Sequence, residues 1–297
     1  MKFENKVIVT IAPTGGVVKQ SQNPHLPTQP AEIAEDVYRC YDAGASIVAL
    51  HARRPDDGAT CRPEIYQDIN SRILAKCNII INNSTGGGID GDMVRPVESG
   101  LDEVIFEQRL KGLEAGADMA TFDAHTVLAC FGGREIVVNT SPARCDIMAK
   151  RFQETGIKPE WECFSLAHLL QDTMRLINKG FDSPPYWINF VLGADRGIQG
   201  GLPYTPQILD TLIGNLPKEA MFCVSGIGRA QLPATTHAVL AGGHVRVGLE
   251  DNLYLEHGRL ATNVRLVEKT VGIIRELGYE PATAAEARAV LGLATRK

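Results

Sequence analysis

Short β-branched runs alternate with helix-length amphipathic runs along the whole chain of 297 residues. Such alternation is typical of parallel strands joined by helical crossovers. The predicted strands are Val7–Pro13, Ser46–Arg53, Asn78–Thr85, Asp118–Ala124, Glu160–Ser165, Tyr186–Gly193, Met221–Gly228 and Val245–Glu250. The predicted helices are 30–44, 62–76, 91–115, 143–156, 167–180, 205–216, 230–242 and 264–278. Eight such units without a Pro/Gly/Ser-rich linker predict one (β/α)8 TIM barrel domain over residues 1–297, with an open doubly wound sheet as the alternative.

The composition excludes several classes of partner. There are 30 Lys and Arg against 35 Asp and Glu, a net charge of −5, and no run of five like charges, which argues against nucleic acid and anionic membranes as partners. The 7 cysteines form no CxxC pair and indicate reduced thiols in the cytoplasm. The first apolar stretch is only as long as a strand, so we expect no signal peptide and no membrane span. A small-molecule ligand is therefore expected.

The predicted strands separate polar from apolar residues by parity. Val245 and Val247 share one face of the last strand, whereas Arg246 and Glu250 share the other. His51 lies on the polar side of the second strand in the same way. A barrel without a site would fill its lumen with Val, Ile and Leu, so the polar faces predict a functional site at the carboxyl ends of the strands.

His51 and Glu250 are candidate metal ligands. Each lies at the carboxyl end of its predicted strand, and the two strands come close at the barrel rim. An imidazole and a carboxylate suit a divalent ion such as zinc, although catalytic zinc usually has three protein ligands and a lone histidine is more often structural. His125, beyond the fourth strand, is the one other histidine expected within reach.

The segment RVGLED places Arg246 shortly before Glu250 and Asp251. One interpretation is a structural salt bridge at the barrel rim. The other is a catalytic pair, in which the guanidinium holds Asp251 ionised and oriented so that it acts as a general base.

A glycine-rich loop, Asn82–Gly88, follows the third predicted strand. The hydroxyl of Ser84 and the backbone of Gly86 and Gly87 suit an anion, and a flexible turn is the alternative. The loop lacks the P-loop lysine and the GxGxxG spacing of nucleotide sites, so a carboxylate is expected rather than a nucleotide phosphate.

Several stretches together resemble the β-keto acid cleavage enzymes, the family of 3-keto-5-aminohexanoate cleavage enzyme. They include APTGG, ASIVALHAR, INNSTGG, GADMATFDAHT, KPEWECFSLAHL, SGIGRAQLP and GGHVRVGLEDN. They extend over nearly the whole chain, and GGHVRVGLEDN is the most specific of them.

The resemblance implies a (β/α)8 barrel that uses one divalent metal ion, usually zinc. The implied reaction condenses a β-keto acid with acetyl-CoA and releases acetoacetate and a new acyl-CoA, in an enzyme that commonly forms homo-oligomers. The implied roles are metal ligand for His51 and Glu250, base for Asp251, orienting partner for Arg246, substrate contact for Ser84 and Thr121, and polar support for Glu162.

The chain departs from the family pattern at Ala49. The usual motif on the second strand is His-x-His, and here it reads Ala-Leu-His, which ends at His51. Either water or another side chain, such as His125, completes the metal shell, or the metal is weak or absent. Even changes beyond the ligands cost ~10–100-fold in metal affinity, so the loss of a ligand should weaken binding strongly.

A second departure is Val17, where the family often has an acidic residue suited to an amino-bearing substrate. A buried ammonium without a partner is costly, so valine predicts an uncharged acyl side chain. Two alternative functions stay open at this point. One is a keto acid lyase that does not need CoA, and the other is a non-catalytic ligand-binding relative, for which Ala49 is the main support.

Overall fold

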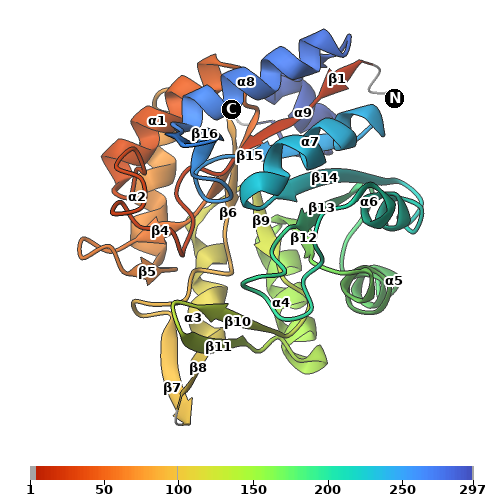
Figure 1. The fold of residues 1–297 in the computed structure, drawn as a ribbon. Coiled ribbons are helices and arrows are strands. Elements are labelled where there is room, and N and C mark those ends of the chain that lie inside the picture. Colours follow the sequence, from red (N-terminus) through yellow and green to blue (C-terminus); the bar gives the residue numbers. More distant parts are fainter. Residues whose placement is uncertain (1–4, 99, 296–297) are drawn as a thin grey trace.

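Eight parallel strands close into a barrel with helices around its outside in this computed structural model, which describes residues 5–98 and 100–295 (Figure 1). In barrel order the strands are β12 (Lys158–Cys163), β13 (Tyr186–Leu192), β14 (Ala220–Gly226), β15 (His244–Val247), β2 (Val9–Ile11), β3 (Ile47–Leu50), β6 (Ile80–Asn83) and β9 (Met119–Phe122). The ring closes because β12 also pairs in parallel with β9. The predicted TIM barrel is thus confirmed over the open sheet.

The helices follow the strands in the expected alternation. They are α1 (Pro30–Asp42), α2 (Pro63–Leu74), α3 (Phe106–Leu110) with the 3-10 helix η1 (Lys111–Ala115), α4 (Pro142–Thr155), the π-helix η2 (His168–Thr173) with α5 (Met174–Asn178), α6 (Pro206–Ile213), the 3-10 helix η3 (Gly228–Ala230) with α7 (Gln231–Leu240), and α8 (Asn263–Glu276). Proline occupies the first turn of α1, α2, α4 and α6, where its missing N–H costs no hydrogen bond. None of the helices in the described residues is long and apolar enough to cross a membrane.

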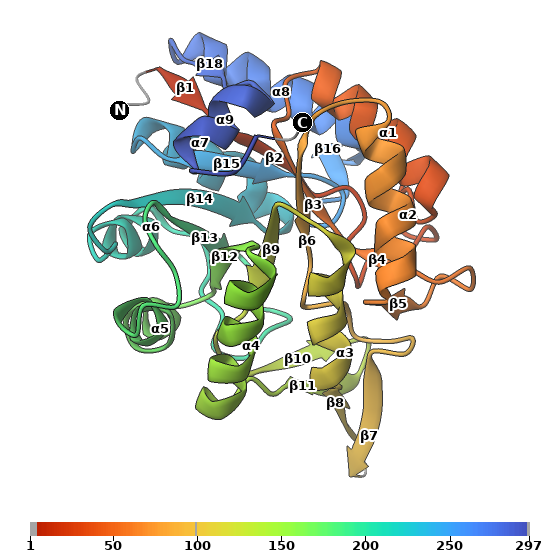
Figure 2. The ribbon, with the colours of Figure 1, turned by 180° about the vertical axis from the view of Figure 1, so that it is seen from behind.

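The parity predicted from the sequence separates two environments. Val245, Val247 and Trp161 belong to the main apolar core, between strands and helices. The floor of the lumen is a second apolar cluster formed by Ile8, Ile47, Ile80, Met119, Trp187 and Cys223. The helix α9 (Ala284–Val290) packs Ala287 into this cluster and lies near the short parallel pair β1 (Lys6–Val7) and β18 (Glu280–Pro281) (Figure 2).

The helix predicted over 91–115 is wrong in its first half. Residues there form an antiparallel hairpin, β7 (Val94–Glu98) and β8 (Leu101–Val104), and only α3 and η1 are helical. The hairpin joins β10 (Val127–Phe131) and β11 (Arg134–Val138) in a four-stranded sheet of order β10-β11-β8-β7. Pro96 disfavours a helix interior but is tolerated in β7, an edge strand of that sheet.

The last barrel strand ends three residues earlier than predicted. Gly248, just beyond β15, has a φ of 149°, and a Cβ there would lie 2.1 Å from the carbonyl oxygen of Ala12. Only glycine permits this close approach of two backbones. Glu250 and Asp251 consequently lie in a turn above the barrel rather than on the strand.

Candidate active site

A cavity of about 1070 Å³ opens at the carboxyl ends of the barrel strands. Seven of the nine site residues predicted from the sequence line it: His51, Ser84, Gly86, Glu162, Arg246, Glu250 and Asp251. The strands and the turn after β15 therefore bring together residues that are up to 200 positions apart in the chain. This end of the barrel is where the fold builds active sites.

Arg246 is the centre of the polar network. Its Nε donates to Oδ2 of Asp251 at 3.0 Å and its Nη2 to Oδ1 at 2.9 Å, which is a two-point contact. The same guanidinium donates to Glu162 at 2.9 Å and to Glu250 at 2.5 Å. One buried cation is thus shared by three carboxylates, and it fixes their orientation.

The pKa values of the three carboxylates do not all shift in the same direction. Burial raises the pKa of Asp251 to about 6, although Arg246 acts in the opposite direction. Burial also acts to raise the pKa of Glu250, but Arg246 and His51 outweigh it and lower that pKa to about 2. Burial raises the pKa of Glu162 well above its ordinary value. The cluster therefore has more acidic groups than Arg246 can neutralise, a balance that suits an additional cation.

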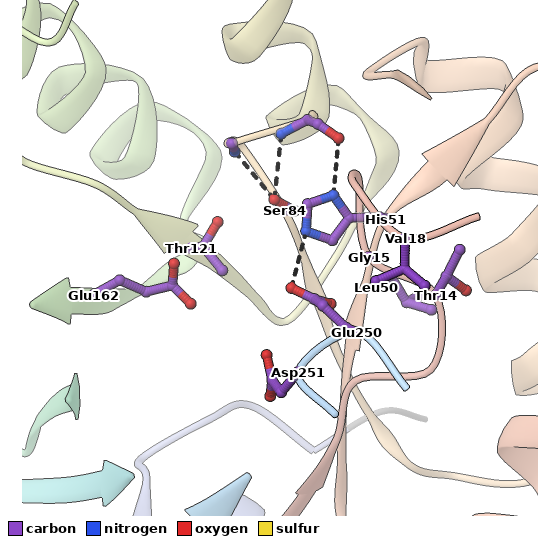
Figure 3. A network of polar contacts seen from close by, with 12 residues as sticks. Thr14, Gly15, Val18, Leu50, His51, Ser84, Thr121, Glu162, Glu250 and Asp251 are labelled. Atoms are coloured by element: carbon purple, nitrogen blue, oxygen red, sulfur yellow. Dashed lines mark hydrogen bonds and ion pairs between the residues drawn. The ribbon is translucent and has the colours of Figure 1, made fainter. Parts of the chain in front are cut away.

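His51 and Glu250 lie next to each other in this network (Figure 3). Nδ1 of His51 is 2.8 Å from the carbonyl oxygen of Gly87, a contact that favours the proton on Nδ1 and leaves Nε2 as a free lone pair. Nε2 lies 3.4 Å from Oε1 of Glu250, and Oε2 of Glu250 is buried without a hydrogen-bond partner among the described residues. These two residues fit a divalent metal ion in donor type and in orientation.

A third protein ligand is missing from the described part of the chain, where no group of three His, Cys, Asp or Glu residues could hold a metal ion. His125 does not join His51 and Glu250. It is buried outside the cavity lining, and its ring stacks on His168 with the centroids 3.7 Å apart. The suggestion that His125 completes the metal shell is therefore wrong in this structure.

The glycine-rich loop uses its backbone N–H groups internally. Oγ of Ser84 accepts hydrogen bonds from the N–H of Gly86 at 3.0 Å and from that of Gly87 at 3.4 Å (Figure 3). The hydroxyl hydrogen of Ser84, and not those two amides, is what the loop can offer to an anion. Gly87 instead orients His51 through its carbonyl, and a Cβ on the facing Gly16 would lie 2.5 Å from that oxygen.

Thr121 and Glu162 are held by neighbouring residues. Oγ1 of Thr121 accepts the N–H of Thr85 at 3.0 Å, and Thr121 does not line the cavity, so its position favours support of the loop over contact with substrate. Glu162 accepts from Nδ2 of Asn189 at 3.3 Å, and Asn189 accepts from Ser225 at 2.8 Å. This chain of hydrogen bonds holds Glu162 against Arg246.

Two buried arginines that shape the site were not predicted. Arg53 donates to the carbonyls of Gly15 at 2.7 Å and Val18 at 2.6 Å, and so holds the first βα loop over the cavity. Arg109 of α3 donates to the carbonyl of Thr85 at 2.9 Å. Arg53 has the same parity as His51 in the predicted strand, and this pattern could have indicated that it lies near the site. No feature of the sequence around Arg109 indicates its role.

The sequence of this chain is similar to those of several known proteins. A family model described as beta-keto acid cleavage enzyme matches residues 6–293. A 3-keto-5-aminohexanoate cleavage enzyme of Acetoanaerobium sticklandii is 38% identical over 290 residues, which cover 97% of this chain and 98% of that protein. A 3-dehydrocarnitine:acetyl-CoA trimethylamine transferase of Rhizobium meliloti is 32% identical, over 100% of this chain and 99% of that protein.

Two further proteins are similar to this chain. A 3-oxoadipate:acetyl-CoA acetyltransferase of Cupriavidus necator is 30% identical over 96% of this chain and 94% of that protein. The solved apo structure of ObcA superposes with a TM-score of 0.74 at 19% identity, over 92% of this chain and 66% of that chain. The likeness to ObcA concerns the fold alone.

Proposed function

Because this chain belongs to the β-keto acid cleavage enzyme family, we propose that it condenses a β-keto acid with acetyl-CoA and releases acetoacetate and a new acyl-CoA. The names of two relatives contain acetyl-CoA as co-substrate, which supports the same co-substrate here. The observation that carries the proposal is the two-point contact of Arg246 with Asp251 inside the cavity. An oriented carboxylate inside the cavity supports removal of a proton from an acidic C–H bond of a bound substrate.

Asp251 acts as the general base in this proposal. Both of its oxygens are bound by Arg246, so the carboxylate has a fixed direction, and a carboxylate that is buried and raised in pKa is a stronger base than one in water. It removes a proton from C2 of the β-keto acid. The hydroxyl of Ser84 is the proposed donor to the substrate carboxylate.

The carbanion at C2 then forms a bond to the thioester carbonyl of acetyl-CoA, and the CoA thiolate leaves. The thiolate adds to the former β-keto carbon, and the bond between that carbon and C2 breaks. The products are an acyl-CoA and the enolate of acetoacetate, which takes back the proton from Asp251. All atoms are conserved, and no covalent intermediate with the protein is needed.

His51 and Glu250 are the residues that would hold a divalent metal ion, for which zinc is the expected identity. Such an ion would supply Lewis acidity toward the keto oxygen of the substrate. The role of this chain is to present Nε2 of His51 and a carboxylate oxygen of Glu250 without a competing hydrogen bond. Treatment with a chelator should lower acetoacetate formation, and added Zn²⁺ should restore it.

An uncharged substrate side chain is supported by the cavity wall. Val17 lines the cavity, together with Val127, Val138 and Phe131 of the four-stranded sheet. These four side chains carry no charge that could pair with an ammonium group, and burying an ammonium without a partner is costly.

The test is a panel of β-keto acids incubated with acetyl-CoA and scored for acetoacetate. Neutral aliphatic side chains should react faster than an amino-bearing one of equal length, and Val17→Glu should narrow that difference. Absence of acetoacetate from every pair contradicts the proposal. Cleavage of the keto acids at an equal rate without acetyl-CoA indicates the CoA-independent lyase instead.

A further inference from the structure

Arg196 and Arg229 differ from the other arginines of the described chain. Every other arginine that the structure describes makes an ion pair or hydrogen bond with another residue, as the exposed Arg95, Arg259 and Arg265 do. Arg196 and Arg229 make none within the described residues, and both side chains are exposed at the mouth of the active-site cavity. They are two positive charges that no group in the described part of the chain neutralises directly.

The two arginines lie on loops that contact each other. Arg196 follows β13 and Arg229 follows β14, and these strands pair in parallel up to Leu192 and Gly226. A Cβ on Gly193 would lie 2.9 Å from Cβ of Ala230, which shows how closely the loops pack. Both cations therefore belong to one side of the rim.

An apolar surface joins this side of the rim to the catalytic network. Phe164, Val191 and Ala194 form a small cluster, and Ile198 and Ile227 pack against it. All five residues line the cavity, as do Arg246 and Asp251. A ligand with an anionic end and an uncharged arm could thus place the anionic end at the rim and the arm along these residues.

We propose that Arg196 and Arg229 bind the phosphate groups of the nucleotide end of acetyl-CoA and thereby aim its thioester at Asp251. This proposal rests on the proposed function, since it assigns a binding site to the co-substrate of that reaction. Exposed guanidinium groups are suited to phosphates because they offer paired N–H donors. The apolar cluster then receives the uncharged pantetheine arm, and the keto acid occupies the side lined by Val17 and Ser84.

Asp195 provides a charge of opposite sign in the same loop. It is exposed, lines the cavity beside Arg196, and makes no hydrogen bond or ion pair within the described residues. Its carboxylate should repel a phosphate group weakly. Asp195→Asn is therefore expected to improve binding of acetyl-CoA, whereas loss of either arginine impairs it.

The experiment compares Arg196→Gln, Arg229→Gln, the double variant and Asp195→Asn with the unmodified enzyme. Each single loss of arginine should raise the KM for acetyl-CoA about fivefold, and the double loss about twentyfold or more, while Asp195→Asn lowers it about twofold. The kcat and the KM for the keto acid should change less than about twofold, because no contact of Arg246 is altered. Arg151→Gln, a half-buried arginine of α4 outside the cavity, is the control.

Acetyl-pantetheine, a thioester without the nucleotide, separates phosphate binding from other effects. With this substrate the arginine variants should match the unmodified enzyme. The proposal is overturned if the arginine variants lose as much with acetyl-pantetheine as with acetyl-CoA, if the KM for the keto acid rises instead, or if no KM changes.

Calorimetric binding of adenosine 3′,5′-bisphosphate, which carries phosphates but no thioester, tests the site without turnover. The unmodified enzyme should bind it, and the double variant should bind it about twentyfold more weakly. If no keto acid yields acetoacetate but this difference is present, the proposed function fails and the phosphate site holds. If turnover is normal but the unmodified enzyme and the double variant bind the bisphosphate equally, the proposed function holds and the phosphate site is overturned.

Discussion

The same strands form an apolar floor at one end of the barrel lumen and a charged mouth at the other. At the floor, Ile80, Trp187 and their neighbours form an apolar cluster that α9 closes. At the mouth, Arg246 is surrounded by Glu162, Glu250 and Asp251. Successive inward residues of one strand contribute to both ends, since β15 supplies His244 to the floor and Arg246 to the mouth.

The difference shows where stability and reactivity reside. Apolar residues at the floor gain free energy by leaving water, and they need no exact partner. Buried carboxylates at the mouth lose hydration, and one guanidinium compensates them only in part. We therefore expect substitutions at the floor to change the free energy of unfolding, and substitutions at the mouth to change turnover.

Asp251→Asn should have the largest effect. Loss of the general base should lower kcat about 10³-fold, within the range that such groups contribute, while the midpoint of thermal unfolding stays close to that of the unmodified protein. Asp210→Asn, an exposed position on α6, is the control and should keep full activity. Full turnover of Asp251→Asn would rule out this residue as the base.

Ile80→Ala tests the floor. The side chain is completely buried, so its truncation should lower the free energy of unfolding by about 3 kcal/mol, measured by urea denaturation. The kcat at a temperature where the variant is folded should be unchanged. Ile147→Ala, at a half-exposed position of α4, should cost less than about 0.5 kcal/mol. A loss of kcat without a loss of stability would contradict the division between floor and mouth.

His244→Asn tests the floor through pH. Burial lowers the pKa of His244 to about 3 from an ordinary value of 6.5, so between these values the unfolded chain binds a proton that the folded chain does not. Stability should therefore fall as the pH decreases below 6.5. Between about pH 7 and pH 5 this single group accounts for about 2 kcal/mol, and the variant should lose that much less stability over the interval. An unchanged pH dependence in urea denaturation would exclude this role.

Ala49→His should have the smallest effect of these four substitutions, and it tests the proposed metal site at the mouth. The substitution adds an imidazole to β3 two residues before His51, so the affinity for Zn²⁺ should rise roughly tenfold or more in competition with a chelator. Ala241→His, on an exposed turn after α7, controls for a surface histidine. Equal affinity of the unmodified protein and Ala49→His would contradict metal binding between His51 and Glu250.

Much of the fold could be predicted because its signals are local. Parallel strands that are covered on both sides leave β-branched runs, and the helices between them begin at residues such as Pro30 and Pro142. The four-stranded sheet was missed although Gly132 and Gly133, both with positive φ, join β10 to β11 in a two-residue turn. Its strands pair with partners that no periodicity identifies, such as β11 with β8.

By itself, the sequence determined which residues face the lumen, because side chains alternate along a strand whatever surrounds it. That rule predicted that His51, Arg246 and Glu162 face the lumen. Only the tertiary structure decided that one guanidinium serves three carboxylates and that His125 packs away from His51 and Glu250. It also decided that Arg196 and Arg229 have no partner among the described residues. These relations depend on the paths of loops, which are set by contacts between residues far apart in the chain.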